Sequence, residues 1–317
     1  MSTLGTRGPV GLKRRVKRVV LRSRGDLRSI TFGSAPAIHA HVPDDMVWNV
    51  CRELILCRIY EPDQIRIGAA SAVVVDAGAH VGIFSLLASA RGARVVAIEP
   101  DPSNYRVLEL NVATNGLGDR IETIHGGLWS EAGSFVYAKG ADSASGTLSI
   151  EDAVRDDITV PAVTLDSILE AFEAVDLLKL DIEGAEVAVL TSSSQLCRVR
   201  AIAAELHFSP DSDEAAQVRD LLEREGFAVW IVPERRLYSL EMFRRAVAQR
   251  RALRGLPFTK LLLIPYFLLH TIARHNPGPD ELPTLYAVRA SDPASTPRRI
   301  TFSRSSAHNA AGSSIRP

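Results

Sequence analysis

Two carboxylates, each at the end of an apolar run, constrain the fold of this chain more than any other feature. The segment Val73-Val-Val-Asp-Ala-Gly-Ala-His-Val-Gly82 ends β-branched residues in an acid and a glycine turn, and a helical pattern follows. A second strand pattern, 94–98, ends in Glu99, 23 positions after Asp76. This order is typical of a β-α-β unit, and ligands of open α/β sheets bind across the carboxyl ends of the strands. An acid about 20 residues beyond a glycine turn can accept both ribose hydroxyls, so the unit is predicted to hold a nucleoside.

The glycine spacing distinguishes between kinds of nucleoside cofactor. The dinucleotide fingerprint G-x-G-x-x-G places a pyrophosphate on a helix N-terminus. Here Asp76, Gly78 and Gly82 leave out the first glycine and set a carboxylate near the turn. That carboxylate would repel a pyrophosphate but would suit a cofactor with an ammonium group, a sulfonium cation and no phosphate. We therefore expect S-adenosylmethionine. A nicotinamide or flavin site and a purely structural β-α-β unit are the alternatives.

Charge is unevenly spread along the chain, although the formal net charge is zero. Residues 71–232 carry 26 acids against 11 bases, residues 1–28 carry nine Lys or Arg against Asp26 alone, and residues 235–254 hold seven arginines. Basic segments bind phosphate, nucleic acid or anionic membrane surfaces. Binding to nucleic acid also favours interleaved aromatic residues, and the N-terminal run has none. We expect no nucleic-acid partner, and either peripheral contact with an anionic membrane or tails that merely balance the acidic domain.

Cysteine content and hydropathy indicate the compartment. Three cysteines, an odd number without metal-ligand spacing, are typical of reduced cytosolic thiols. The basic N-terminus precedes no continuous apolar stretch, so it does not resemble a secretory signal. The stretch 256–272 is the nearest candidate for a membrane span, but Lys260 and two prolines within it argue against spanning. We expect a cytoplasmic protein with, at most, peripheral contact at the inner membrane surface.

Alternating strand and helix patterns predict an α/β fold with one doubly wound, Rossmann-like sheet. The domain is expected over 71–290, after a basic N-terminal extension over 1–70 that holds a hairpin and a helix ending near Ile59. Small antiparallel strands are expected between the third and fourth parallel strands. A late helical insertion, 234–283, and a disordered tail, 291–317, complete the predicted organisation.

Two further strand patterns end in groups capable of acid–base chemistry. One ends in Asp181, with Glu183 in the following loop, and carboxylates at a buried strand end cost solvation unless something uses them. The next ends in Glu205 and His207, which alternation places on one face. These four are the candidate catalytic residues, able to orient a substrate, exchange its proton or hold a hard metal ion. No spacing in the sequence requires a metal, and a structural histidine with solvated loop acids is the alternative.

Four short segments follow the pattern of one enzyme family. They are Val74-Val-Asp-Ala-Gly-Ala-His-Val-Gly82, Thr164-Leu-Asp166, Leu178-Lys-Leu-Asp-Ile-Glu-Gly-Ala-Glu186 and Ala204-Glu-Leu-His207. Together they resemble the FkbM-type methyltransferases, S-adenosylmethionine-dependent enzymes of the Rossmann-like class I type. The resemblance covers about residues 60–232, and the Lys-x-Asp-x-Glu-Gly-x-Glu string is quite specific. His80 stands where the family commonly has Asn.

This resemblance implies roles for particular residues. The glycine turn would bind the methionine part of the cofactor, Glu99 would bind the ribose hydroxyls, and the residues after the third strand would lie near the adenine. Asp181 would lie between cofactor and acceptor. The expected cofactor-binding residues are Asp76, Gly78, Ala79, His80, Gly82, Glu99, Gly127 and Leu128.

The resemblance also implies the reaction. Family members characteristically methylate hydroxyl oxygens of sugars, glycolipids or polyketides, so we expect O-methyl transfer to a small-molecule or glycan acceptor. Asp181 and His207 are both candidates for the base that removes the hydroxyl proton. The apolar part of the 234–283 insertion, next to seven arginines, would suit a lipid-linked acceptor. An NAD(P)-dependent oxidoreductase and a non-catalytic nucleoside-binding scaffold are the competing functions.

Overall fold

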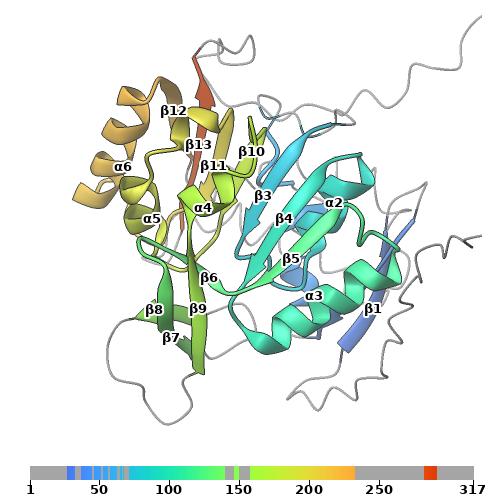
Figure 1. Cartoon of the computed structure of the whole chain (residues 1–317). Coiled ribbons are helices and arrows are strands. Elements are labelled where there is room, and N and C mark those ends of the chain that lie inside the picture. The colour runs from blue at the N-terminus through green and yellow to red at the C-terminus, as the bar shows by residue number, and fades with distance from the viewer. Residues whose placement is uncertain are drawn as a thin grey trace, which may run out of the picture.

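A mixed sheet forms the centre of the protein in the computed structural model, which describes residues 27–32, 37–44, 46–50, 53–55, 58–62, 65, 67, 71–139, 146–149, 158–232 and 282–290. Within these residues the largest sheet has seven strands (Figure 1). In spatial order they are β12 (Phe227–Val232), β13 (Thr284–Arg289), β11 (Ala201–Glu205), β10 (Leu177–Leu180), β3 (Val73–Ala77), β4 (Arg94–Glu99) and β5 (Ile121–His125). The strands from β11 to β5 are parallel, and β13 is antiparallel to both of its neighbours.

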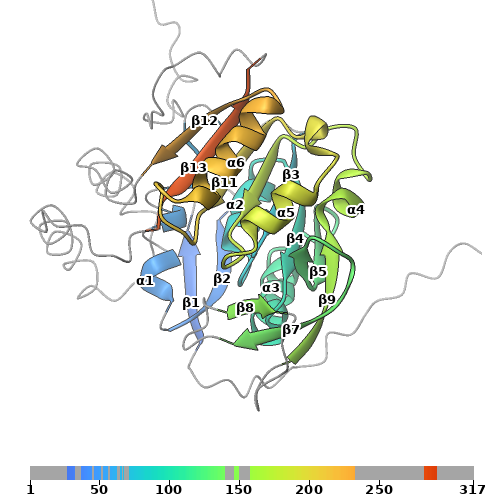
Figure 2. The same cartoon turned by 90° about the vertical axis from the view of Figure 1, so that its left-hand side faces the viewer.

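Helices cover both faces of this sheet (Figures 1 and 2). One face carries α2 (Ile83–Ala90) and α3 (Pro102–Thr114), and the other carries α4 (Leu165–Leu169), α5 (Glu186–Ser192) and α6 (Asp213–Arg224). Successive strand residues pack into opposite layers: Val74 joins the α2/α3 core and Val75 the α4–α6 core, and both are fully buried. Continuous apolar runs suit strands buried on both faces. The predicted doubly wound architecture is therefore confirmed.

The N-terminal hairpin packs on the α2/α3 side of the sheet. Its strands are β1 (Leu27–Phe32) and β2 (Ile38–Pro43), which pair antiparallel as predicted. The side chain of Asn111 in α3 fixes β2, because its Nδ2 atom donates to the carbonyl of His41 at 2.9 Å and its Oδ1 atom accepts from the His41 amide at 2.7 Å. The same Nδ2 atom donates to the Val81 carbonyl at 2.8 Å. One buried amide thus joins the hairpin to the turn after β3.

The helix predicted to end near Ile59 is described in two pieces, the four-residue α1 (Val47–Val50) and a π-helical turn over 53–55. Arg58 adopts a left-handed φ of 53°, and the Ile59 amide donates to the carbonyl of Glu53 at 3.0 Å. A left-handed residue followed by such a backward hydrogen bond is a common end to a helical segment. This closure turns the chain so that Tyr60 lies beneath the sheet edge instead of continuing a helix.

A small second sheet lies between β5 and α4. Its strands, in spatial order, are β6 (Gly127–Trp129), β9 (Ile158–Thr164), β7 (Gly133–Lys139) and β8 (Gly146–Ser149). The antiparallel pairs β7–β8 and β7–β9 agree with the expectation of small antiparallel strands, but β6 pairs parallel to β9 and was not predicted. A Cβ on Gly126 would lie 2.6 Å from the Pro161 carbonyl oxygen. Glycine at this position therefore lets β6 start directly after β5.

Two predicted parts lie largely outside the described residues. They are the insertion 234–283, of which only the last two residues are described, and the tail 291–317.

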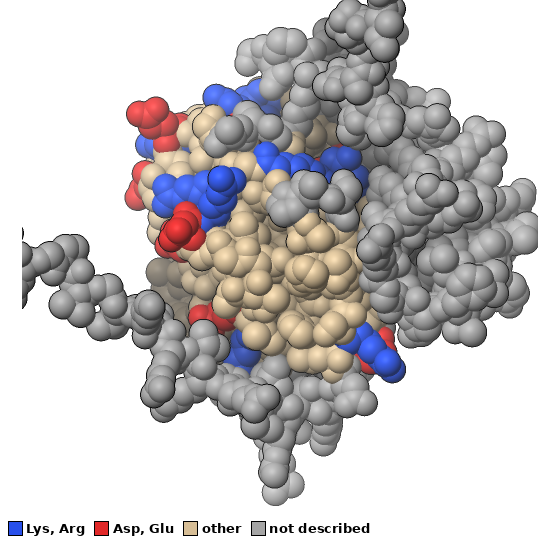
Figure 3. Space-filling view, turned by 90° about the vertical axis from the view of Figure 1, so that its right-hand side faces the viewer, with Lys and Arg blue, Asp and Glu red and all other residues tan. Residues whose placement is uncertain are grey.

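Figure 3 shows a face of the molecule on which most of the described surface is uncharged, with Lys and Arg side chains towards its margins. Within the described residues, no helix combines the length and apolar character needed to cross a bilayer.

Candidate functional site

A cavity of about 380 Å³ lies at the carboxyl ends of the parallel strands. Its walls come from the turn after β3, the end of β4, the start of β6, the loop after β10 and the end of β11, together with Tyr60 and Tyr137. The volume falls within the range of about 300–1,000 Å³ that is usual for small-ligand pockets. Ligand crevices of open α/β sheets lie at this edge, so the cavity is the candidate functional site.

Close packing explains the glycines of the turn after β3. Gly78 has a φ of +73°, and a Cβ there would lie 1.7 Å from the carbonyl oxygen of Asp181. Gly82 has a φ of +82°, and a Cβ there would lie 2.3 Å from the Cδ1 atom of Leu108. Between them His80 adopts a φ of +51°, a left-handed conformation that costs a non-glycine residue about 1–3 kcal/mol. The turn is therefore held in a conformation that a relaxed chain would avoid.

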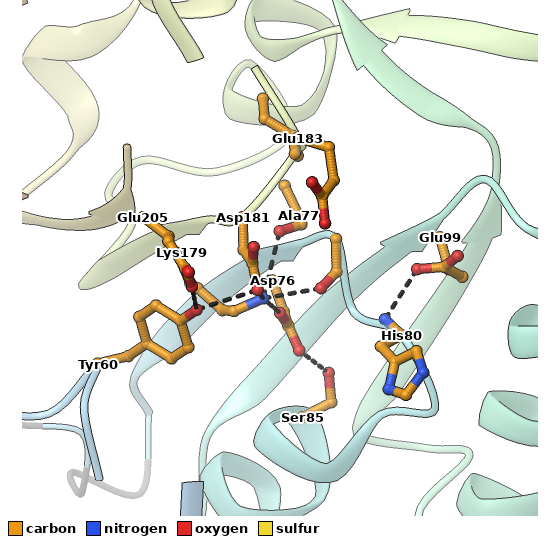
Figure 4. A network of polar contacts seen from close by, with 12 residues as sticks. Tyr60, Asp76, Ala77, His80, Ser85, Glu99, Lys179, Asp181, Glu183 and Glu205 are labelled. Carbon is orange, nitrogen blue, oxygen red and sulfur yellow. Dashed lines mark hydrogen bonds and ion pairs between the residues drawn. The ribbon is translucent and has the colours of Figure 1, made fainter. Parts of the chain in front are cut away.

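Glu99 ends β4 and supports this turn from the side (Figure 4). Its Oε2 atom accepts from the His80 amide at 2.8 Å, and its Oε1 atom accepts from the Asp101 amide at 2.9 Å. Burial raises the pKa of Glu99 to about 7, although both backbone donors act in the opposite direction. The Asn104 side chain also donates to this carboxylate, which leaves about one of its four lone-pair sites unused. The carboxylate can therefore accept a ligand hydroxyl group from the cavity.

Asp76 is fully buried beneath the turn. Its Oδ2 atom accepts from the Ser85 hydroxyl at 2.6 Å, and its Oδ1 atom lies 3.1 Å from Nζ of Lys179. Lys179 also donates to the Gly78 carbonyl at 2.7 Å. Asp76 thus organises the turn from inside the protein, and its contact with a cofactor stays a prediction.

Lys179 is a site residue that the sequence reasoning did not single out. The pairing of β10 with β3 places Lys179 opposite Asp76, and its side chain is 4% exposed. The ammonium group of Lys179 is not an isolated charge. Burial lowers its pKa, but the negative charges of Asp76 and Asp181 outweigh burial and raise the pKa above its usual value. The available signal was a single lysine within an otherwise apolar buried strand.

Tyr60 enters the site from the N-terminal extension and lies between two carboxylates (Figure 4). Its hydroxyl is 3.0 Å from Oδ2 of Asp181 and 2.9 Å from Oε2 of Glu205. Lys179 places Nζ 3.5 Å from the same Asp181 oxygen and 5.0 Å from the centre of the Tyr60 ring. Burial raises the pKa of Glu205 to about 8, and the charge of Asp181 adds to this. Nothing in the local sequence indicated that Tyr60 would reach this position.

His207 is bonded to two carboxylates. Its Nδ1 atom lies 3.0 Å from Oε1 of Glu186 and its Nε2 atom 3.2 Å from Oε2 of Glu183. Burial lowers the pKa of His207, but the hydrogen bonds to Glu183 and Glu186 outweigh it and raise the pKa to about 11. Oε1 of Glu186 also accepts from the backbone amides of Ile182 and Gly184. His207 is therefore an imidazolium at neutral pH, with both N–H groups donated.

Asp181, Glu183 and His207 bring ligand-type atoms within 4.8 Å of one another. A metal ion would need an imidazole nitrogen with a free lone pair. Both ring nitrogens of His207 lie within 3.2 Å of carboxylate oxygens, so a metal ion at this cluster would have to displace a proton from the ring.

The structure brings together most residues predicted for the site. All four candidate catalytic residues, Asp181, Glu183, Glu205 and His207, line the cavity. So do six of the eight expected cofactor-binding residues, Gly78, Ala79, His80, Glu99, Gly127 and Leu128. Asp76 and Gly82 lie behind the wall, where they shape the turn. The individual contacts with cofactor and acceptor stay predictions.

Sequence comparison relates this chain to methyltransferases. Residues 76–229 match the model of the methyltransferase FkbM domain. The chain is 29% identical over 214 residues to methyltransferase sdnD of Sordaria araneosa, a match that covers 56% of this chain and 81% of that protein. It is 31% identical over 226 residues to the AMB antimetabolite synthetase AmbE of Pseudomonas aeruginosa, a match that covers 57% of this chain but only 11% of the much longer synthetase.

Similar solved structures are distant. The precorrin-6y C5,15-methyltransferase of Geobacter metallireducens aligns with a TM-score of 0.37 and 11% identity, covering 72% of this chain and 85% of that chain. TYW2 of P. horikoshii, solved in complex with MeSAdo, aligns with a TM-score of 0.40 and 11% identity, covering 82% and 70%. Similarities at this level do not bear on the reaction.

Proposed function

Because residues 76–229 of this chain belong to the FkbM methyltransferase family, we propose that the protein transfers a methyl group from S-adenosylmethionine to a hydroxyl oxygen of a sugar, glycolipid or polyketide-type molecule. The observation that carries the choice of a hydroxyl acceptor is Asp181, a carboxylate that lines the cavity and keeps 29% of its side chain exposed. An alcohol is a weak nucleophile and benefits from a base that removes its proton.

The residues present fit S-adenosylmethionine, the cofactor of this family. Five carboxyl groups line the described cavity, against two basic groups, Lys179 and the His207 imidazolium. This balance suits a cofactor with sulfonium and ammonium groups and disfavours the pyrophosphate of a nicotinamide dinucleotide. Glu99 would hold the ribose hydroxyls. The glycine at position 78 would let the backbone of the turn approach the cofactor closely. When bound, the cofactor supplies a methyl group that is already activated for transfer.

Asp181 is the better candidate for the base. Both N–H groups of His207 are donated to Glu183 and Glu186, so this ring has no nitrogen able to accept a proton. Asp181 accepts a hydrogen bond at Oδ2 and keeps its other oxygen for the acceptor. A positioned base typically contributes about 10²–10⁴ in rate, and alignment of the reacting atoms contributes roughly 7–11 kcal/mol. The acceptor would bind on the Tyr60 and Glu205 side of the cavity.

Partners are part of the proposal. A small-molecule acceptor agrees with the name of one relative, an antimetabolite synthetase. A lipid-linked acceptor would be reached through the basic segments 1–28 and 235–254 at an anionic membrane surface, without nucleic acid as a partner. Sedimentation with vesicles tests this: binding to phosphatidylglycerol vesicles that is lost in 0.5 M salt (~3–5 Å screening length) is expected, and equal sedimentation with neutral vesicles would contradict it.

Calorimetry tests the cofactor, and isotope transfer tests the reaction. We expect S-adenosylmethionine and its demethylated product to bind and NADH not to bind. Label from the methyl group should enter a hydroxyl of at least one member of a panel of glycans, glycolipids and polyketides. Asp181→Asn should abolish this transfer and keep cofactor binding, whereas Asp119→Asn, at an exposed loop acid, should change neither. Tight binding of NADH without heat from S-adenosylmethionine would refute the proposal.

A further inference from the structure

We propose that Tyr60 is a positioning residue that keeps one proton on the Glu205 carboxyl and leaves the Asp181 carboxylate ionised towards the acceptor. The inference rests on the proposed methyl transfer, and it adds a residue from outside the family-matched segment 76–229 to the site. Tyr60 acts through Asp181 and not on the acceptor itself. The hydroxyl of Tyr60 joins the ends of β10 and β11, the two strands that carry the carboxylates.

The count of hydrogens carries this inference. A phenol has one hydrogen, but the Tyr60 oxygen lies 3.0 Å from Asp181 and 2.9 Å from Glu205. If both carboxylates were ionised, the phenol could donate to only one, and its lone pair would face the negative oxygen of the other. Repulsion at such a distance in a buried site is costly. One carboxyl therefore carries a hydrogen, and the three groups form a chain in which each contact has its own donor.

The surroundings decide which carboxyl carries the hydrogen. Lys179 lies 3.5 Å from the Asp181 oxygen that faces Tyr60, and Asp181 is partly exposed, so its ionised form is stabilised. Glu205 is more deeply buried and faces the negative charges of Asp181 and Glu53, and all of these raise its pKa. Together they outweigh His207, which lowers it. The hydrogen therefore resides on Glu205, which donates to the Tyr60 oxygen, and Tyr60 donates to Asp181.

Tyr60 is held in place from several sides. Its ring packs edge-on to Phe84 at 5.7 Å between centroids, and Lys179 lies over its face. The preceding carbonyl, that of Ile59, accepts from the hydroxyl of Tyr286 in β13. Tyr60 is only 2% exposed as a whole residue, so water does not replace its hydroxyl group. These contacts keep the donor pointed at Asp181 through the reaction.

The chain of hydrogen bonds agrees with a balanced transfer step. The acceptor hydroxyl gives its proton to Asp181, and its oxygen takes the methyl group, while the electron pair of the broken carbon–sulfur bond stays on sulfur. Asp181 then releases the proton to solvent, to which it is partly exposed. Tyr60 donates to Asp181 at 3.0 Å and so holds this carboxylate in place before the step.

Carboxyl ¹³C NMR of the full chain, with labelled Asp and Glu, tests this without cofactor or acceptor. Asp181→Asn and Glu205→Gln assign the two signals. In the wild type, we expect the Glu205 carboxyl to titrate at about 8 and therefore to be mostly protonated at pH 7. In Tyr60→Phe the Glu205 carboxyl loses the oxygen to which it donates, so its midpoint should fall by about one unit. Tyr105→Phe, at a half-buried tyrosine whose hydroxyl lies 3.2 Å from the Thr123 hydroxyl, should leave it unchanged. A Glu205 midpoint that is unchanged or rises in Tyr60→Phe would overturn the proposal.

Kinetics with an acceptor identified by the isotope assay give a second readout. Tyr60→Phe should lower kcat about tenfold and leave both KM values within about twofold. Glu205→Gln should keep about half of the activity or more, because its amide N–H can replace the carboxyl O–H. A Glu205→Gln variant as inactive as Asp181→Asn would overturn the proposal. If no acceptor is methylated, the proposed function fails, and the NMR midpoints still decide the role of Tyr60.

Discussion

Oε1 of Glu186, a carboxylate without solvent exposure, lies 3.0 Å from Nδ1 of His207. This ion pair joins the end of β11 to the first turn of α5, and the second ring nitrogen of His207 joins it to the loop after β10 through Glu183. A helix N-terminus stabilises an acid in its first turn by about 0.3–1 kcal/mol. The structure adds the bond to a cation, so Glu186 and His207 should be treated as one unit.

Replacing His207 with Gln should destabilise the protein in a pH-dependent way. Loss of the cation leaves the buried Glu186 carboxylate uncompensated, at a cost of about 3–5 kcal/mol. The folded-state pKa of about 11 exceeds the ordinary value of about 6.5. The stabilisation is therefore complete below pH 6.5 and is lost as the pH rises towards 11. Urea denaturation at pH 6, 8 and 10 should show that the difference in free energy of unfolding between wild type and variant narrows as the pH rises. A difference that stays constant would contradict this account.

Cofactor affinity should depend on pH through Glu99. Its pKa of about 7, raised by burial, means that the carboxylate is half protonated near neutral pH. The ionised form accepts ribose hydroxyls better, so calorimetry should show affinity for S-adenosylmethionine rising as the pH increases from 6 to 8 and levelling off above. Glu99→Gln should bind about tenfold or more weakly and show a flat pH dependence, because a hydrogen bond from a charged group contributes about 1.5–3 kcal/mol. A variant with the wild-type slope would assign the pH dependence to another group.

Alanine at two glycines separates backbone strain from steric overlap. Gly78 and Gly116 both have positive φ, of +73° and +65°, but a Cβ at Gly116 meets no atom within 4 Å. Gly116→Ala should lower the free energy of unfolding by about 1–2 kcal/mol, the cost of a left-handed residue. Gly78→Ala adds a contact 1.7 Å from the Asp181 backbone, so it should cost several times more and weaken cofactor binding. Equal losses in denaturation experiments would show that the overlap is relieved cheaply.

Lys179 and Asp76 should behave as a coupled pair. Lys179→Met leaves a fully buried carboxylate without its cation, which costs about 3–5 kcal/mol. In the double variant Asp76→Asn, Lys179→Met the charge is gone, and the Asn oxygen still accepts from Ser85. We therefore expect the double variant to regain at least about half of the stability that Lys179→Met loses. Denaturation of the wild type, both single variants and the double variant measures this. Strictly additive losses would mean that the two side chains do not interact energetically.

Sequence reasoning identified the site because strand ends are predictable. Asp181 and Glu205 follow buried apolar runs. Right-handed crossovers between parallel strands bring the ends of such runs to one edge of the sheet. The direction of a side chain at that edge was not predictable. Asp76 occupies the end of β3 but turns beneath it, towards Ser85 and Lys179, because a buried cation is available there. Only the paired register of β3 and β10 reveals this.

Tyr60 and the charge of His207 could not be read from local patterns. The hydroxyl of Tyr60 bonds to residues 121 and 145 positions away, and its segment precedes the regular β-α alternation. Alternation correctly placed His207 on the same side as Glu205. Its protonation depends on Glu183 adopting a left-handed φ of 55°, which bends the loop towards the imidazole. Such a conformation is unusual for Glu, and the surrounding contacts select it.

The position of β13 has a consequence for how the site is completed during synthesis of the chain. Strand β12 pairs with β13 and not with β11, yet β13 begins about 50 residues after β12 ends. The hydroxyl of Tyr286 in β13 also secures the peptide that precedes Tyr60. A nascent chain that has released the whole family-matched segment from the ribosome therefore still has an open sheet edge and an unsecured tyrosine. The arrangement around Tyr60 is therefore complete only when β13 is in place.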